Sequence, residues 1–380
     1  MVLRCLKVAG IRNLATQTLL PASGANLLVG PNGSGKTSLL EAIHLLGRGR
    51  SFRTRSMEAV VNREMESFSV YGELVDDQSD PDAFCRRLGV SRETGRGFCY
   101  RVDGNTAKAA SVLADALPLV VINSHSLQIL EGPPRERRRF LDWGLFHTMP
   151  EIRREWRRYH LAHQQRNALL RQKSPDSGQL DLWDVQLAHA GEVITRARFN
   201  YALQMAAAVK ALLKDLSPEL VGGLELGLYP GWERQQELLV ALKAHRDRDI
   251  MSRNTQVGPH RADLRITWNH QPATEFFSRG QGKVLVYALF LSQGAHFRQR
   301  RGRSCLNLID DLPAELDEQH QRRIAEMLLR AGGQHFVTGT DIDQMRAVWR
   351  GGGDRNPDRL KVFHVKQGQV RPDTRAESPP

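Results

Sequence analysis

The stretch Gly30-Pro31-Asn32-Gly33-Ser34-Gly35-Lys36-Thr37 decides how the rest of this 380-residue sequence is interpreted. It lies between an apolar, strand-like run at 26–29 and a segment at 38–46 whose leucines and isoleucine recur at helical spacing. The pattern G-x-x-x-x-G-K-[ST] between a strand and a helix is typical of a phosphate-binding P-loop. Glycines let the backbone turn its N–H groups toward phosphate oxygens, Lys36 adds a positive charge, and the Thr37 hydroxyl is placed to ligate Mg²⁺. A chance turn around a lysine is the weaker interpretation, because the strand and the helix are both present.

The bulk composition limits the class of protein. The formal net charge of +12 predicts attraction to polyanions such as nucleic acid, although a generally basic surface is the alternative. No apolar stretch approaches the roughly 20 residues of a membrane span, and the first residues lack the pattern of a secretory signal. The four cysteines are scattered, as expected of free thiols in a reducing compartment. We therefore expect a cytoplasmic protein with no membrane partner.

The chain divides by its hydrophobic pattern. Strand-like runs fill 1–122, whereas charged and apolar residues interleave at helical spacing from about 133 to 216, with a break at 174–178. Strand-like runs return after Ser217-Pro218. We predict the N-terminal part of a strand-rich domain with the P-loop at 1–122, a helical lobe with basic arms at 123–255, the rest of the strand-rich domain at 256–368 and a disordered tail at 369–380.

A second motif in the C-terminal half complements the P-loop. Residues 306–309 form an apolar run that ends in Asp310 and Asp311, which is the form of a Walker B element. Asp310 is expected to hold Mg²⁺, and Asp311 to orient or deprotonate the attacking water. A strand that ends in two solvated aspartates is the alternative, and the P-loop makes it the weaker one.

Two further pieces indicate an ABC-type ATPase. The run 277–281, with Ser278, Gly280 and Gln281, resembles the signature sequence of that class, and 315–317 resembles its D-loop. In that class the signature serine and the helix N-terminus bind the γ-phosphate of ATP held by the other subunit, a position that suits an anion. Taken alone, Ser278 fits a simple helix N-cap, but the order of the four motifs favours the ABC interpretation.

The sequence also resembles the RecF family of bacterial recombination and repair proteins over nearly its whole length. The resemblance is carried by the phrases at 37–43, 49–54, 138–143, 258–264, 278–281, 309–311 and 315–317. It implies an α/β P-loop NTPase fold: an ABC/SMC-type ATPase head with an inserted helical lobe. It also implies the cofactors ATP and Mg²⁺, an ATP-dependent homodimer, and binding to single-stranded, gapped or junction DNA. Family members hydrolyse ATP slowly, with stimulation by DNA, and act with RecO and RecR to load RecA and support the SOS response.

The resemblance also assigns residues by position. Lys36 and Thr37 would bind phosphate and magnesium, and Ser278 would act across the dimer. The weaker assignments to the nucleotide are Arg12, Asn13 and Arg53. Two departures leave the water-positioning residues open: 123–126 has no glutamine at the expected place, and the switch position is either Thr338 or Thr340 rather than histidine.

Basic residues along the predicted helical lobe are candidates for DNA contacts. Arginines four apart share a helical face and could follow a phosphate backbone. The candidates are Arg137, Arg138, Arg153, Arg154, Arg157 and Arg158. A solvated helix face with ion pairs to Glu151 and Glu155 is the alternative for any single arginine.

Two other functions share some of these motifs. The nucleotide-binding subunit of a transporter, or another SMC-like ATPase, also has a P-loop and a signature; the basic lobe and the missing switch histidine disfavour the transporter. A small-molecule kinase also has a P-loop, but it would act as a monomer with no role for Ser278.

Overall fold

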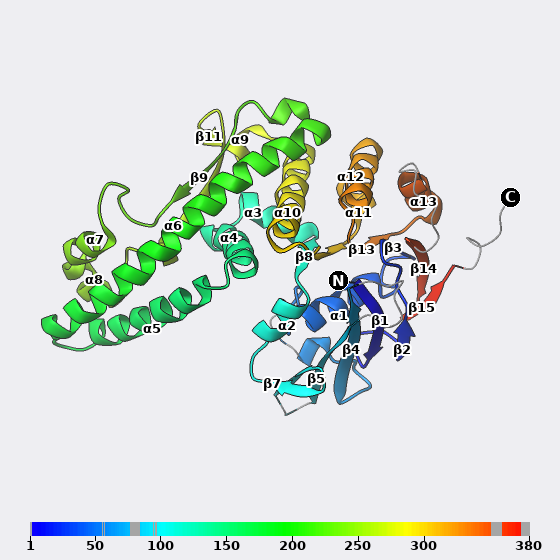
Figure 1. The fold of residues 1–380 in the computed structure, drawn as a ribbon, viewed down its shortest axis with the longest axis horizontal. Helices are drawn as coiled ribbons and strands as arrows, with labels where there is room; N and C mark the ends of the chain where they lie inside the picture. The colour runs from blue at the N-terminus through cyan, green and yellow to red at the C-terminus, as the bar shows by residue number, and fades with distance from the viewer. Residues whose placement is uncertain are drawn as a thin grey trace. The chain divides into compact units, whose positions relative to one another are not determined.

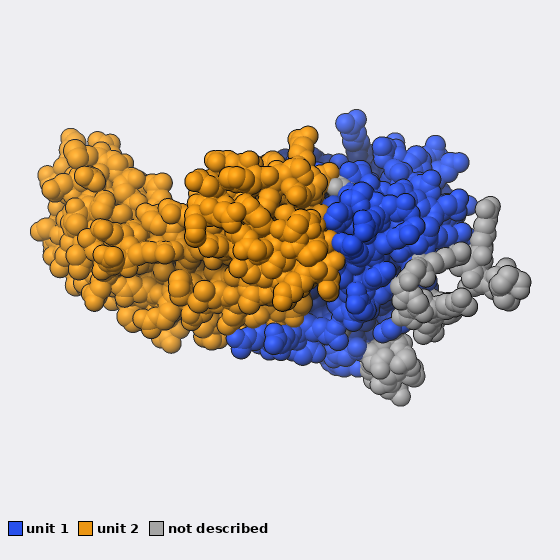
Figure 2. Space-filling view, turned by 90° about the horizontal axis from the view of Figure 1, so that it is seen from above, with its two compact units in different colours: residues 1–126, 297–380 blue, residues 127–296 orange. Residues whose placement is uncertain are grey.

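The computed structural model describes residues 2–54, 56, 58–76, 84–93, 95, 97–350 and 359–373. The chain forms two compact units, one from residues 1–126 together with 297–380 and the other from residues 127–296 (Figures 1 and 2). We describe each unit by itself.

The first unit combines two sheets with helices (Figure 1). Its strands are β1 (Val2–Ala9), β2 (Gln17–Leu19), β3 (Ala25–Val29), β4 (Ser67–Val75), β5 (Cys85–Glu93), β6 (Phe98–Val102), β7 (Asn105–Ala107), β8 (Leu119–Ile122), β12 (Leu306–Ile309), β13 (His335–Gly339), β14 (Leu360–Lys366) and β15 (Gln369–Pro372). Its helices are α1 (Lys36–Arg48), α2 (Ser111–Ala116), α11 (Leu312–Glu315), α12 (Glu318–Ala331) and α13 (Ile342–Arg350), with short 3₁₀ turns at Glu58–Val60 and Ser124–Leu127.

The parallel sheet places the two phosphate-site motifs at one edge. Its strand order is β15-β14-β3-β13-β12-β8, and all neighbours are parallel except the hairpin of β14 and β15. The P-loop follows β3 and the two aspartates follow β12, with β13 between these strands. Because carboxyl ends of parallel strands share an edge, ligands of such sheets bind there. The second sheet, β2-β1-β4-β5-β6-β7, is antiparallel.

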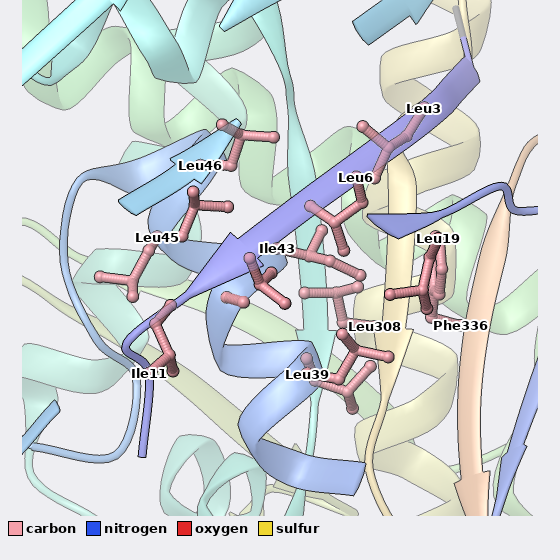
Figure 3. Packing of buried hydrophobic residues seen from close by; sticks show 14 of the residues in the cluster. Leu3, Leu6, Ile11, Leu19, Leu39, Ile43, Leu45, Leu46, Leu308 and Phe336 are labelled. Carbon is pink, nitrogen blue, oxygen red and sulfur yellow. The ribbon is translucent and has the colours of Figure 1, made fainter. Parts of the chain in front are cut away.

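Helix α1 joins these two sheets through a shared core (Figure 3). Its fully buried Leu39 and Ile43 belong to the same apolar cluster as Leu6 of β1 and as Leu308 and Phe336 of the parallel sheet. Burying such side chains contributes about 1.5–3 kcal/mol each. The core therefore fixes the helix that follows the P-loop.

The C-terminal end differs from the predicted tail. Residues 369–372 form β15, which pairs with β14 across a two-residue turn at Gln367 and Gly368. Both turn residues have positive φ (48° and 78°), as a tight hairpin requires. The prediction of disorder from 369 was wrong at this hairpin, because low hydrophobicity was taken as evidence against a strand. Residues 374–380 of that prediction lie outside the described residues.

The second unit is mainly helical, with a small sheet of order β11-β10-β9. Its helices are α3 (Gln128–Glu131), α4 (Pro134–Thr148), α5 (Ile152–Leu170), α6 (Ser177–Leu216), α7 (Leu238–Ala244), α8 (Arg246–Ser252), α9 (Ala273–Phe276) and α10 (Arg279–Arg301, which continues into the first unit), with 3₁₀ turns at Pro218–Leu220 and Pro259–Arg261. Its strands are β9 (Leu224–Tyr229), β10 (Asp263–Trp268) and β11 (Gln271–Pro272). The break at 174–178 separates α5 from α6, and the Asp176 side chain caps α6 by accepting from the Gln179 N–H at 2.9 Å.

The boundary of the second unit lies elsewhere than predicted. We placed the end of the lobe at residue 255, but the compact unit continues to residue 296. Strand β9 precedes that predicted boundary and β10 follows it, yet the two pair antiparallel along their whole length. A division between paired strands would leave backbone groups unpaired, so the sheet belongs to one unit. In the described part of the chain, no helix is both long and apolar enough to cross a bilayer.

Candidate nucleotide site

The P-loop has the backbone of a phosphate cradle. Gly35 precedes α1 with φ at 115°, a conformation that side chains rarely adopt. At Gly30 a Cβ atom would lie only 2.1 Å from the Val365 carbonyl oxygen, so the strand edge approaches too closely for any other residue. The loop thus leads into the N-terminus of a 13-residue helix, whose free N–H groups and dipole favour an anion.

Lys36 is held across the cradle. Its side chain is largely buried, and Nζ donates to the carbonyl oxygens of Gly30 at 2.6 Å and Pro31 at 3.0 Å. Burial lowers the pKa of Lys36, and the carboxylates of Asp311 and Asp310 oppose that shift. The ammonium group therefore lies at the loop with two acidic groups near it.

Four side chains from three elements meet beside the cradle. The Thr37 hydroxyl lies 3.0 Å from both carboxylate oxygens of Asp310. The Thr338 hydroxyl donates to Asp310 Oδ1 at 2.8 Å and accepts from the Asp311 N–H at 2.7 Å. Asp311 has left-handed backbone angles (φ 58°, ψ 49°), which a non-glycine residue adopts at a cost. Of the two threonines left open by the sequence, Thr338 is the one in contact with the aspartates.

These residues line one cleft of about 1220 Å³, formed entirely by residues of the first unit. Among the predicted nucleotide residues, those that line the cleft are Arg12, Asn13, Asn32, Gly33, Gly35, Lys36, Thr37, Arg53, Asp310 and Asp311. Ser124, from the region without the expected glutamine, also lines it. The cleft is large enough for a nucleotide. A hydroxyl and a carboxylate side by side are hard oxygen donors of the kind that Mg²⁺ uses together with phosphate oxygens.

A buried glutamate that the sequence did not single out organises the cleft wall. Glu41 of α1 is fully buried and pairs with Arg12 through two hydrogen bonds of 2.9 Å. Arg53 Nη1 lies 3.6 Å from the same carboxylate, and the Ser51 hydroxyl donates to it. The sequence signal that could have found Glu41 is its place in the helix among Leu39, Leu40, Ala42 and Ile43, all of which are buried. Both predicted arginines therefore line the cleft with Glu41 as their partner.

Hydrogen bonds from two other segments hold the P-loop backbone in place. Asn13 donates from Nδ2 to the Gly33 carbonyl at 3.0 Å, and the Ser38 hydroxyl donates to Asn13 Oδ1 at 3.1 Å. From the hairpin of β14 and β15, the Gly368 N–H donates to the Ser34 carbonyl at 2.8 Å. A Cβ at Gly368 would lie 1.8 Å from the Asn13 carbonyl oxygen. The segment predicted to be a disordered tail thus begins as one strand of a hairpin whose turn contacts the phosphate cradle.

The signature run lies in the second unit, at the start of α10. Ser278 Oγ accepts from the Gln281 N–H at 3.2 Å, and Gln281 Oε1 accepts from the Ser278 N–H at 3.0 Å. This reciprocal pair is a capping box. Ser278 and Gly280 are exposed. The geometry agrees with the N-cap alternative and also presents a hydroxyl at the N-terminus of a long helix. In the D-loop run, Asp317 caps α12 by accepting from the His320 N–H at 3.0 Å.

The candidate DNA residues fall into two groups. Arg137 forms a bidentate pair with Asp263, with N···O distances of 2.7 and 3.1 Å, and Arg138 donates to the Ala262 carbonyl at 2.7 Å. Arg153 lies over the Phe146 ring, 4.0 Å from its centroid. These three guanidinium groups have internal partners, so we revise their assignment as DNA contacts. The second group is exposed: Arg154 and Arg157, and Arg158 with a 3.1 Å pair to Glu155.

The comparisons with known sequences agree over most of the chain. Residues 2–356 match the family model described as the RecF/RecN/SMC N-terminal domain. A protein of Pseudomonas putida strain GB-1 named DNA replication and repair protein RecF is 40% identical over 370 residues, which is 97% of this chain and 98% of that protein.

Solved structures give the same architecture. The ATP-bound form of the recombination mediator protein RecF in the RecFOR pathway aligns with a TM-score of 0.82 at 25% identity, over 98% of both chains. An SMC head bound to the C-terminal winged-helix domain of ScpA aligns with a TM-score of 0.56 at 14% identity, over 98% of this chain and 97% of that one. The second similarity shows the fold alone: an SMC-type head.

Proposed function

The chain belongs to the RecF family of DNA replication and repair proteins, which share the head fold of SMC proteins, and on this basis we propose that it uses ATP to control its own binding to DNA. The observation that carries the proposal is the meeting of Lys36, Thr37 and Asp310 in one cleft at the end of the parallel sheet. A similar RecF structure is named for its bound ATP, which supports ATP as the ligand here.

Each cleft residue has a proposed role. The backbone of 30–37 and the Lys36 ammonium bind the phosphates, with Arg12, Asn13 and Arg53 on the surrounding wall. Thr37 and Asp310 would hold Mg²⁺, which neutralises charge on the outer phosphates when bound. Asp311 orients or deprotonates the attacking water, and Thr338 fixes both aspartates through its single hydroxyl. We expect slow hydrolysis, stimulated by DNA.

In ABC-type ATPases, two subunits contribute the groups that contact each ATP. The cleft of this chain contains the groups of one subunit. We propose that Ser278, Gly280 and Gln281 contact the γ-phosphate bound by a second copy of the chain, so that ATP stabilises a homodimer. The exposed hydroxyl at the start of the 23-residue helix α10 supports this role. Hydrolysis would then release the dimer.

DNA is the proposed partner of that dimer. The exposed Arg154, Arg157 and Arg158 on α5 are the proposed phosphate contacts, and the net charge of +12 supports a polyanionic partner. We propose single-stranded or gapped DNA as the substrate, RecR and RecO as protein partners, and RecA loading with SOS induction as the outcome. A similar structure is described as RecF in the RecFOR pathway, and this supports RecR and RecO as partners.

Light scattering with and without ATP and Mg²⁺ tests the proposal. The wild type is expected to double its mass with ATP, and Ser278→Arg to bind ATP yet remain monomeric, because the added side chain fills the space of the γ-phosphate. Ser174→Arg, at an exposed position between α5 and α6, is the matched control and should dimerise normally. Normal dimerisation of Ser278→Arg would contradict the role of Ser278.

A further inference from the structure

The antiparallel sheet of the first unit has a water-facing side that the nucleotide site does not use. Its inner side contributes Leu6, Val70 and Leu88 to the core around α1. On the opposite side, the strand register aligns a row of residues across four neighbouring strands: Lys7 of β1, Tyr71 of β4, Gly89 of β5 and Arg101 of β6. We call these four residues the outer row.

The tyrosine of the outer row is held in place. Its hydroxyl donates to Glu73 Oε1 at 3.0 Å, and Glu73 Oε2 accepts from Arg4 at 3.3 Å. Lys7 Nζ lies over the ring, 5.5 Å from its centroid. Because Lys7 comes from the strand on one side, the other face of the ring is turned toward β5 and Gly89. Tyr71 is therefore a fixed aromatic surface rather than a mobile side chain.

Gly89 leaves a gap beside that ring. A Cβ atom placed on Gly89 would meet only the Arg101 Cβ, at 3.5 Å. Neighbouring strands are about 4.8 Å apart, so the strands of Tyr71 and Arg101 are separated by roughly 9.6 Å. A planar ring stacked between two planar groups needs about 7 Å, from two van der Waals separations of about 3.5 Å. The gap fits one flat aromatic ring between a phenol and a guanidinium group.

The charge around the gap selects the kind of ligand. The outward side of the described sheet carries four cations, Arg4, Lys7, Arg87 and Arg101, and two carboxylates, Glu73 and Glu93. Glu73 is already neutralised by Arg4. Lys7, Arg87 and Arg101 are exposed, and the outer row has no large aliphatic side chain to bury against a protein. A ligand with a flat ring on an anionic chain would fill the gap with its ring and pair its negative charges with these cations.

We propose that this face of the sheet binds single-stranded nucleic acid, with one base stacked over Gly89 between Tyr71 and Arg101, and with Lys7 and Arg87 on backbone phosphates. Aromatic and arginine stacking combined with a basic surface is the usual means of binding single strands. Duplex DNA keeps its bases stacked internally and cannot fill the gap. This site goes beyond the proposed function, because it needs neither ATP nor a dimer and shares no residue with the nucleotide cleft.

Fluorescence anisotropy with labelled (dT)20, without nucleotide and at low salt, tests the site. Gly89→Val fills the gap with a residue that strands accept, and the affinity is expected to fall at least about fivefold. Ser91→Val places the same side chain two residues along the same face and should change the affinity less than twofold. Tyr71→Leu should lose as much affinity for (dT)20 as Gly89→Val does. Tyr71→Phe retains the ring and should bind (dT)20 nearly as well as the wild type.

Two further measurements separate this site from the nucleotide cleft. ATP affinity of Gly89→Val and binding of a 20-base-pair duplex are both expected to equal the wild type. If Gly89→Val and Tyr71→Leu bind (dT)20 normally, the proposal is overturned, even if they lose a protein partner instead. If Ser278→Arg dimerises with ATP while Gly89→Val loses (dT)20, the proposed function fails and this site stands.

Discussion

The nucleotide cleft and the arginines of the helical unit show two different relations between sequence and structure. In the cleft, Lys36, Thr37 and Asp310 were predicted from motif spacing, and they lie together. In the helical unit, arginines were predicted from charge and helical spacing, and four of the six have partners within the unit: Arg137, Arg138 and Arg153, and the exposed Arg158 with Glu155. The difference lies in what each signal specifies. A P-loop pattern specifies a backbone path, whereas a run of arginines specifies charge without direction.

The helical unit also uses arginine where no charge pattern indicates it. Arg166 of α5 is fully buried between Asp184 and Asp249, at N···O distances of 2.6 and 2.7 Å. It also donates to the Thr255 hydroxyl at 2.9 Å. Helix α5 therefore carries a buried arginine that holds the unit together and, elsewhere on its surface, exposed arginines that a ligand can reach.

The largest effect is expected from removing that buried charge. Arg166→Met leaves Asp249 buried without its cation and leaves Asp184 with Arg246 alone, so the free energy of unfolding should fall by about 3–5 kcal/mol. Denaturant titration measures it. Gln165→Met, at the exposed neighbouring position, is the control and should change stability by less than about 0.5 kcal/mol. Equal stabilities of the two variants would show that the buried network contributes nothing.

The next largest effect is expected from removing the positive charge of Lys36 in the P-loop. Lys36→Ala removes a charged donor beside the phosphates, which is worth about 1.5–3 kcal/mol, so ATP affinity should fall roughly 10- to 150-fold. Isothermal titration calorimetry measures it. Lys108→Ala, exposed on the same unit, should bind ATP as the wild type does. Unchanged ATP affinity of Lys36→Ala would contradict the role of the P-loop lysine in binding phosphate.

The sequence could predict elements whose signal is local. The P-loop, the Walker B strand and the return of strands after Ser217-Pro218, now seen as β9 and β10, were predicted because short apolar runs and turn residues mark them. Asp103 and Gly104, which join β6 and β7 with φ of 52° and 84°, carry a local signal of the same kind.

What the sequence could not predict depends on contacts between distant segments. Glu41 reads as an ordinary helix residue until Arg12, 29 positions away, becomes its partner. The pairing of β9 with β10 moved the predicted boundary at 255, because pairing partners are not marked in either strand. Gly368 gains its role only from the close approach of the Asn13 carbonyl oxygen.

A smaller effect is expected at a buried histidine beside the cleft strands. Burial lowers the pKa of His335 to about 4, and its ring donates to the Leu328 carbonyl at 3.1 Å. Because the folded pKa lies below the unfolded value of about 6.5, the neutral form stabilises the fold above pH 6.5 and this contribution is lost as the pH falls toward 4. The stability difference between wild type and His335→Asn should therefore shrink by up to about 1.4 kcal/mol per pH unit. Denaturation at pH 7, 6 and 5 measures it, and a difference independent of pH would mean that folding does not lower the pKa of His335.

The smallest effect on stability is expected for Arg157→Ala, and its comparison with Arg137→Ala separates the two kinds of arginine. Arg137→Ala removes the bidentate pair to Asp263, so the unfolding free energy should fall by about 2 kcal/mol while the salt dependence of DNA binding stays unchanged. Arg157→Ala, on the exposed side of α5, should alter stability by less than about 0.5 kcal/mol. It should reduce the slope of log affinity against log salt by about 0.7–0.9, the contribution of one phosphate contact. The reverse pattern would mean that Arg137 exchanges Asp263 for a phosphate when DNA binds, and internal pairing would then no longer separate structural arginines from DNA contacts.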